Sequence, residues 1–183
     1  MASAGGAGYQ DANLYIWGIF EKYVLPAAGP VLGTMEVFWK IMKWSFEALA
    51  SGKYPLMDWR GQPFPVGSKE TRQAGTDLAE GFCGVLIQVA GDLDYFSKWL
   101  ETPRVTNHEK PCPLCKATFE GPMSYLDNRR GSPWQKSLLL PSNYKTHWSP
   151  KGPLYTMAGF SNQCLAMDFM HCMHLGWLQH FFW

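Results

Sequence analysis

The segment from residue 104 to residue 153 constrains the fold of this chain more than any other feature, because it is long and rich in Pro, Gly, Asn and Ser. An irregular stretch of about 50 residues is improbable inside a compact domain unless something holds it in place. Two cysteines, Cys112 and Cys115, lie within the segment as Cys-Pro-Leu-Cys. This spacing predicts that a bound metal ion braces the segment.

Cys-x-x-Cys with an internal proline is typical of a zinc knuckle. The tight turn directs both sulfurs toward one point, and thiolate is the soft ligand that zinc prefers. A tetrahedral site needs two further ligands, and His171 and His174 lie three residues apart on an expected helix, where both project from one face. We predict a structural zinc ion held by Cys112, Cys115, His171 and His174. Three side chains of ligand type are in reserve: Cys172, His147 and His108.

Other interpretations of these residues stay open. The two cysteines are alternatively a pair of reduced structural thiols, and His174 is alternatively a histidine on a helix surface. A thioredoxin-like redox pair is less favoured, because no expected strand leads directly into the Cys-x-x-Cys sequence.

The cysteine count and the N-terminal residues indicate the compartment. Five cysteines are an odd number, and two of them are spaced as Cys-x-x-Cys, which is unlike a secreted disulfide framework. Residues 1–10 lack the basic start of a signal peptide and are expected to be a disordered tail. No stretch reaches the roughly 18 uncharged apolar residues of a membrane span. We expect a nuclear or cytoplasmic protein in a reducing environment, with no membrane partner.

The chain carries a net charge of only +1, so no global electrostatic field directs it to a polyanion. The charge is uneven, however, because residues 102–155 hold eight Lys or Arg against three acidic residues. Such a basic segment is consistent with a nucleic-acid partner and equally with a solvated loop surface. The candidate DNA contacts are Arg129, Arg130, Lys136 and Lys145.

Hydrophobic periodicity predicts helices over residues 12–25 and 31–50, separated by Pro26 and the Gly29-Pro30 pair. In the second helix, apolar residues recur every three or four positions and Gly52 lies just past the end. This stripe comprises Met35, Phe38, Met42, Phe46 and Leu49, and Trp39 and Trp44 lie off it.

Residues 82–90 form a mostly apolar run of strand length, which predicts a buried central strand. The apolar residues that follow fit a helix of about two turns that stops before Pro103. A short strand is expected over residues 164–167 and a terminal helix over residues 170–182. The predicted fold class is α/β, with α+β as the alternative.

Two aspartates stand where these strands end. Asp92 follows the apolar run of residues 82–90, and Asp168 follows residues 164–167. Carboxylates are the hard oxygen ligands that Mg²⁺ needs in a two-metal phosphoryl-transfer site, so both residues are candidate catalytic acids. Each is alternatively a simple N-cap for the helix that follows it.

The order of these motifs resembles the middle section of CACTA-type DDE transposases and of related transposon-derived proteins of protists and fungi. The resemblance covers residues 82–183. It implies a partial RNase H-like core, Mg²⁺-dependent DNA strand cleavage and transfer, and binding to element termini. By the same resemblance, Asp92 matches the second catalytic acid, and Asp168 with His171 matches an Asp-x-x-His signature. The sequences that carry it are Gly91-Asp92-Leu93, Pro111-Cys112-Pro113-Leu114-Cys115 and Met167-Asp168-Phe169-Met170-His171, with Leu175-Gly176 and His180.

The sequence departs from that family in its acids. A first acid is expected on an earlier strand of the same sheet, yet the upstream candidates, Asp58 and Asp77, lie on no expected strand. A third acid is expected on a helix well beyond His171. We therefore expect a truncated or degenerate relative that is inactive alone and retains DNA binding. The alternative is a non-catalytic zinc-binding module that docks a protein partner through Trp39, Trp44, Trp177 and Trp183.

The predicted elements divide the chain into five parts. These are residues 1–10 (tail), 11–53 (helical segment), 54–101 (core loop, strand and helix), 102–155 (irregular Cys-x-x-Cys insertion) and 156–183 (strand and terminal helix with the Asp-x-x-His motif).

Overall fold

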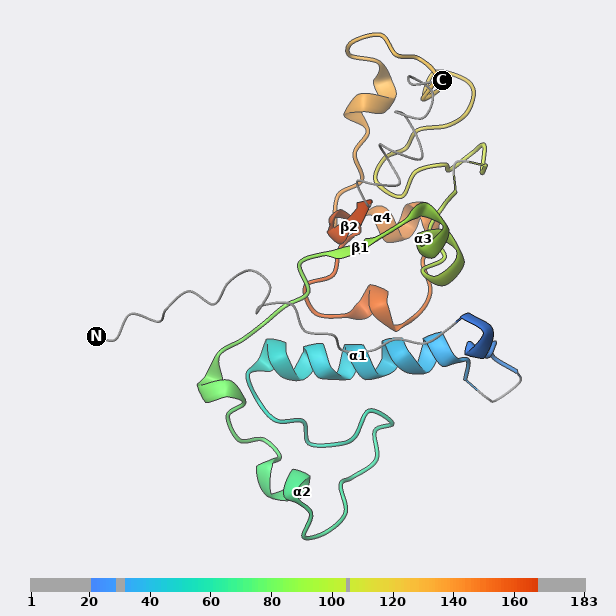
Figure 1. The fold of residues 1–183 in the computed structure, drawn as a ribbon. Helices are drawn as coiled ribbons and strands as arrows, with labels where there is room; N and C mark the ends of the chain where they lie inside the picture. The colour runs from blue at the N-terminus through green and yellow to red at the C-terminus, as the bar shows by residue number, and fades with distance from the viewer. Residues whose placement is uncertain (1–20, 29–31, 105, 168–183) are drawn as a thin grey trace, which may run out of the picture.

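The computed structural model describes residues 21–28, 32–104 and 106–167 of the chain (Figure 1). The predicted tail, most of the first predicted helix and the predicted terminal helix lie outside these ranges. The helices are α1 (Thr34–Ser51), α2 (Lys69–Gln73), α3 (Leu93–Trp99) and α4 (Tyr144–Trp148), and the strands are β1 (Val89–Gly91) and β2 (Leu165–Met167). Short 3-10 turns lie at Glu21–Tyr23, Ala79–Gly81, Pro133–Lys136, Pro153–Thr156 and Asn162–Cys164.

Helix α1 crosses the middle of the molecule. Figure 1 shows the loop that carries α2 on one side of α1, and the sheet, α3 and α4 on the other side. The segment around residues 106–140 forms the end of the molecule farthest from α2. Within the described ranges, no helix is both long enough and apolar enough to cross a bilayer.

The predicted helix over residues 31–50 is confirmed as α1, with one difference in which side chains it buries. Gly52 ends the helix in the left-handed conformation, φ 65°, and its N–H is satisfied by the last carbonyls of the helix. Most of the predicted stripe packs on the core, but Leu49 is 37% exposed. Trp39, which lies off the stripe, is the buried residue of α1, at 9% exposure. The apolar face of α1 is therefore wider than its periodicity indicates.

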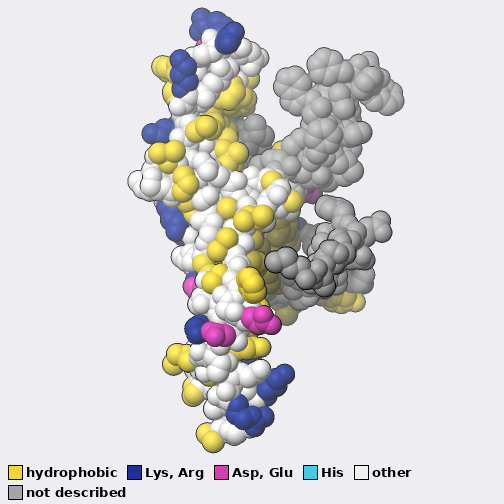
Figure 2. All heavy atoms as spheres, turned by 90° about the vertical axis from the view of Figure 1, so that its left-hand side faces the viewer, with side chains coloured by type: hydrophobic (Ala, Val, Ile, Leu, Met, Phe, Trp, Pro, Cys, Tyr) yellow, Lys and Arg dark blue, Asp and Glu magenta, His cyan; other side chains and the backbone are white. Residues whose placement is uncertain are grey.

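The predicted buried central strand over residues 82–90 is wrong. Only Val89–Gly91 forms a strand, and it pairs in parallel with β2, with Gly91 opposite Met167. Phe82 is 76% exposed and Ile87 is 80% exposed. Figure 2 faces this side of the molecule and shows hydrophobic side chains exposed along its middle. In the described part of the chain, β2 is the strand that pairs with this run, and β2 spans three residues. The rest of the run therefore has no neighbouring strand with which to pair.

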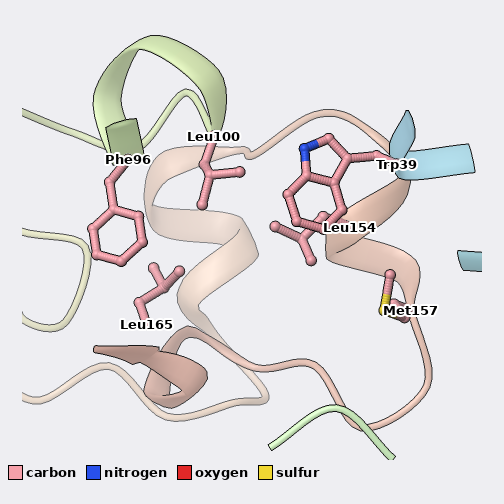
Figure 3. Packing of buried hydrophobic residues seen from close by; sticks show 6 residues of the cluster. All are labelled: Trp39, Phe96, Leu100, Leu154, Met157 and Leu165. Atoms are coloured by element: carbon pink, nitrogen blue, oxygen red, sulfur yellow. The ribbon is translucent and has the colours of Figure 1, made fainter. Parts of the chain in front are cut away.

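The main hydrophobic cluster lies between α1 and the small sheet. Leu154, from the 3-10 turn Pro153–Thr156, lies against the ring of Trp39 (Figure 3). On the other side of the cluster, Phe96 of α3 is fully buried and Leu165 of β2 is 4% exposed. Burial of such side chains is the main stabilising contribution of this region. The buried members are Trp39, Phe96, Leu100, Leu154, Met157 and Leu165.

The prediction of an irregular segment over residues 104–153 is confirmed for its described residues, in which Pro133–Lys136 and Tyr144–Trp148 are helical and Pro153 begins a further 3-10 turn. A second small cluster of Leu139, Tyr144 and Tyr155 joins the end of this segment to the core. The Tyr155 hydroxyl donates a hydrogen bond to the Leu100 carbonyl, which ties the segment to the end of α3.

Candidate functional site

The Cys112–Cys115 turn has the backbone arrangement of a thiolate-binding knuckle. The Leu114 N–H donates to Cys112 Sγ at 3.3 Å. Backbone hydrogen bonds from Leu114 and Cys115 lower the pKa of Cys112, and one from Ala117 acts in the same direction on the pKa of Cys115. Peptide N–H groups that point at sulfur stabilise the deprotonated form, which is the form that binds metals.

The two thiols interact directly and differ in their protonation. The hydrogen bond from Cys115 is the largest cause that lowers the pKa of Cys112, to about 6. The same hydrogen bond, together with burial, raises the pKa of Cys115 well above its ordinary value. At neutral pH the pair therefore shares one proton, with Cys112 as thiolate and Cys115 as thiol. Neither forms a disulfide.

A short backbone ladder fixes the knuckle against the strand-like residues that follow the Pro133–Lys136 turn. The Lys116 N–H donates to the Ser137 carbonyl at 3.1 Å, and the Leu139 N–H donates to the Leu114 carbonyl at 2.8 Å. Cys115 and Leu138 face each other as an antiparallel pair. Leu114 and Lys116, on either side of Cys115, are thus held by main-chain hydrogen bonds, which fix the backbone around the Cys115 sulfur.

Asn162 connects the knuckle to the core, and the sequence analysis did not single it out. Its side chain is fully buried, and its amide nitrogen donates to the Leu139 carbonyl at 3.0 Å and to the Pro113 carbonyl at 3.4 Å. Asn162 stands three residues before β2, so it links the knuckle to the sheet. The sequence gives no local signal that distinguishes Asn162, because it stands beside a second amide, Gln163, within residues 157–167.

The predicted zinc site has two of its four ligands in the described structure. Cys112 and Cys115 are adjacent and suit zinc by donor type, whereas His171, His174 and the reserve Cys172 lie outside the described residues. No group of three or more His, Cys, Asp or Glu that could hold a metal occurs in the described ranges. The thiol pair therefore fits half of a tetrahedral zinc site.

The two reserve histidines lie in different surroundings. His108 stacks on the ring of Phe119, with ring centroids 4.5 Å apart. His147 has a buried Nε2 with no hydrogen-bond partner among the described residues. Burial, followed by the charges of Lys110 and Lys116, lowers the pKa of His147 and keeps it neutral. Neither His147 nor His108 forms a group of three with Cys112 and Cys115 in the described structure, so neither reserve histidine completes the predicted zinc site there.

Asp92 stands at the end of β1, as predicted, and caps α3. Its Oδ1 accepts a hydrogen bond from the Tyr95 N–H at 2.5 Å, so the simple N-cap role is present. The residue before it, Gly91, is paired with Met167 at the end of β2. The residue that follows Met167 in the sequence is the second candidate acid, Asp168, which lies outside the described residues.

The predicted DNA contacts are not equivalent. The Arg129 guanidinium contacts the carboxylate of Asp127 with two hydrogen bonds of 2.9 Å, and this arginine holds the pKa of Asp127 well below its usual range. Arg130 and Lys136 are exposed, and the Lys145 ammonium lies 5.9 Å from the ring centroid of Tyr144. Figure 2 shows Lys and Arg side chains at both ends of the molecule and along the side between them.

Comparison of the chain with protein-family models, with curated proteins and with solved structures gives no match in any of the three. The interpretation of the site therefore rests on its own geometry. That geometry consists of the Cys112–Cys115 turn, braced by backbone hydrogen bonds, and a parallel strand pair with Asp92 directly after its first strand.

Proposed function

We propose that this chain is a transposase-related, DNA-binding protein whose partial α/β core is braced by a zinc ion at Cys112 and Cys115. The observation that carries the proposal is the parallel pairing of β1 with β2, in register at Gly91 and Met167. Each of these strands is followed directly in the sequence by an aspartate.

Parallel strands place their carboxyl ends at one edge of the sheet, which is where α/β proteins bind their ligands. Asp92 and Asp168 are the residues that follow those two ends. Carboxylate oxygens are the ligands that Mg²⁺ takes from proteins. The N-cap role of Asp92 does not by itself exclude metal binding, because an ionised carboxylate has about four lone-pair sites and can make several contacts at once.

The proposal does not include strand cleavage by the chain alone. Asp58, one upstream candidate for a first acid, accepts the backbone N–H groups of Arg60 and Gln62 within a turn. Asp77, the other candidate, forms an ion pair with Lys53 away from the sheet. Neither lies on a strand beside β1 in the described structure. Two-metal chemistry needs the complete set of carboxylates, so we propose metal and DNA binding without cleavage.

The carboxylate part of the proposal is tested by Mn²⁺ binding, with Mn²⁺ as a spectroscopic substitute for Mg²⁺. We expect D92N and D168N each to weaken Mn²⁺ binding by about tenfold or more, since each removes one oxygen ligand. D94N is the matched control, because Asp94 is exposed in the same helix and pairs with Arg104 at 3.0 Å. Equal Mn²⁺ affinity of D92N, D168N and D94N would contradict the proposal.

The DNA part is tested with a fluorescent duplex at several salt concentrations. We expect R130Q/K136Q to reduce the slope of log K against log salt by about two, because each substitution leaves one phosphate without its neutralising cation. R129Q should change the slope less, because Arg129 is already paired with Asp127. Failure of the wild-type chain to bind the duplex at low salt would exclude DNA binding through these residues.

A non-catalytic zinc-binding interaction module is the second candidate function, and the exposed apolar run Phe82, Val85 and Ile87 favours it. Trp39 does not serve as a surface anchor for a partner, because it is buried in the core. Zinc binding without any effect of D92N on Mn²⁺ affinity would support this module. Loss of Mn²⁺ binding in D92N would favour the transposase-related function instead.

A further inference from the structure

We propose that a groove between α1 and the turn at Asp58–Gly61 binds single-stranded nucleic acid, with a base stacked on Trp59 and phosphates held by Lys40, Lys43 and Arg60. This site is separate from the knuckle and from the end of β1, and it does not depend on the function proposed for them. The groove has a volume of about 570 Å³ and is lined by Lys40, Lys43 and Trp44 of α1 and by Asp58, Trp59 and Arg60 of the turn.

The turn that carries Trp59 is rigid. The Gly61 N–H donates to the Asp58 carbonyl at 2.9 Å, and the Asp58 N–H donates to the Gln62 carbonyl at 2.9 Å. The Asp58 carboxylate also accepts the N–H groups of Arg60 and Gln62, each at 2.8 Å. Gly61 has φ 76°, a conformation that glycine adopts without strain. Trp59 and Arg60 are therefore presented at the tip of a preorganised hairpin, so binding costs little ordering of this loop.

The turn is also fixed relative to α1. The Trp44 indole N–H donates to the Met57 carbonyl at 2.8 Å, one residue before the turn begins. Lys40, Lys43 and Trp44 lie on one face of the helix, because residues three and four apart are neighbours there. The two lysines therefore stand beside the hairpin tip at positions set by the helix backbone.

Trp59 and Arg60 form a pair suited to a stacked base. The guanidinium carbon of Arg60 lies 4.6 Å from the centroid of the Trp59 ring, which is a cation–π contact. Aromatic rings interleaved with cations are the recurring feature of proteins that bind single strands, since every base has a face that stacks and every nucleotide has a phosphate. The arrangement supplies both interactions within one groove.

The carboxylates in the groove are already engaged by the protein. Asp58 is used by the backbone of its own turn, and Glu47 pairs with Lys43. Lys40 pairs with Glu36 at 3.1 Å. These are exposed pairs one helical turn apart, which contribute little to stability and exchange readily for a phosphate. The lining residues carry three cations, Lys40, Lys43 and Arg60, against the two carboxylates Glu47 and Asp58, and this excess of one positive charge favours a polyanion over an apolar protein segment as the occupant.

The test uses the full chain and a fluorescent single-stranded 20-mer of thymidylate. Stacking on an aromatic side chain is lost in W59A, so we expect its affinity for the 20-mer to fall by about tenfold, with most of it kept in W59F. K40Q/K43Q should lower the salt slope by about one unit or more. Trp99 is the matched control, because it too lies under a cation, with Lys98 at 5.1 Å from its ring centroid, yet stands outside this groove.

The outcomes distinguish this site from the DNA contacts proposed at the knuckle end. R130Q/K136Q should weaken duplex binding and leave the W59A effect on the 20-mer unchanged. W59A with the affinity of wild type, or a W99A loss equal to that of W59A, would overturn the proposal. Two further results would overturn the proposal. One is that the 20-mer does not bind at low salt, and the other is that an apolar peptide binds in the groove and the 20-mer does not.

Discussion

The cluster around α1 and the knuckle around Cys112 are held together by different interactions. Phe96 and Leu154 are almost completely buried among apolar neighbours, and the cluster requires nothing beyond the chain itself. The knuckle depends on backbone N–H groups that point at sulfur, on a short ladder to residues 137–139, and on the buried amide of Asn162. The side-chain oxygen of Asn162 has no hydrogen-bond partner among the described residues, so this polar network is only partly satisfied.

This difference explains how an irregular segment persists beside a compact core. The segment over residues 104–153 has few helical residues, so regular backbone hydrogen bonding does little to hold it. Its fixed points are the knuckle, Asn162 and the Tyr155 hydroxyl. Removal of the proposed zinc ion, or loss of these polar groups, should therefore loosen the knuckle and leave α1 intact, whereas loss of core volume should destabilise the whole fold.

The largest expected effect is that of metal removal on the knuckle. After zinc chelation we expect the Lys116 and Leu139 amides to exchange with solvent at least about a hundredfold faster, because structural zinc sites contribute folding energy directly. The α1 amides should exchange at their original rate. Site-resolved hydrogen exchange measures the rates of both sets of amides in one experiment. Equal acceleration in α1 and in the knuckle would contradict the claim that different interactions hold the two regions.

A large cavity in the core should affect both regions. F96A removes a fully buried ring and should cost about 3–5 kcal/mol in the free energy of unfolding, measured by urea denaturation. F82A is its matched control, because Phe82 is 76% exposed and its loss should change stability by about 0.5 kcal/mol or less. Similar costs for the two variants would contradict the assignment of the core.

An intermediate effect is expected where the two regions meet. N162A leaves the Leu139 and Pro113 carbonyls without their donor and should cost about 1–3 kcal/mol in the free energy of unfolding. N128A, which changes an exposed asparagine within the irregular segment of residues 104–153, should be close to neutral. If hydrogen exchange of the knuckle amides is unchanged in N162A, the asparagine does not connect the knuckle to the core.

A separate prediction concerns the dependence of the metal-free knuckle on pH. The folded-state pKa of Cys112, about 6, lies below the ordinary value of 9.0. Between these values the unfolded chain binds more protons than the folded one, so stability rises as pH increases from 6 toward 9 and is lost as pH falls through 6. Alkylation of Cys112 followed against pH should show a midpoint near 6. C115A, which lacks the thiol donor, should move that midpoint upward, and an unchanged midpoint would contradict the pairing.

Sequence periodicity predicted the elements that depend on local pattern. Helix α1, the short helix after Asp92, and the strand that ends at Met167 all follow from apolar spacing and from caps that lie next to them in the sequence. It failed for residues 82–90, because an apolar run becomes a buried strand only where partner strands lie beside it. Pairing partners are set by tertiary structure, which a single run does not encode.

For the candidate site too, the sequence predicts what depends on local spacing and misses what depends on contacts between distant residues. The knuckle was evident from the spacing of Cys112 and Cys115, because both sulfurs come from one turn. The contribution of Asn162 depends on a contact across 49 positions in the chain, and such a contact leaves no local pattern. Trp39 was likewise placed off the apolar stripe, yet Leu154 from a distant turn covers its ring.

The zinc content of the purified chain tests the central claim most directly. We expect one zinc ion per chain in the wild type and in C83S, since Cys83 is exposed and outside the knuckle, and absence of that zinc in C112S/C115S. A wild-type chain purified without zinc, or a C112S/C115S variant that retains it, would contradict the account of the knuckle as a metal-braced site.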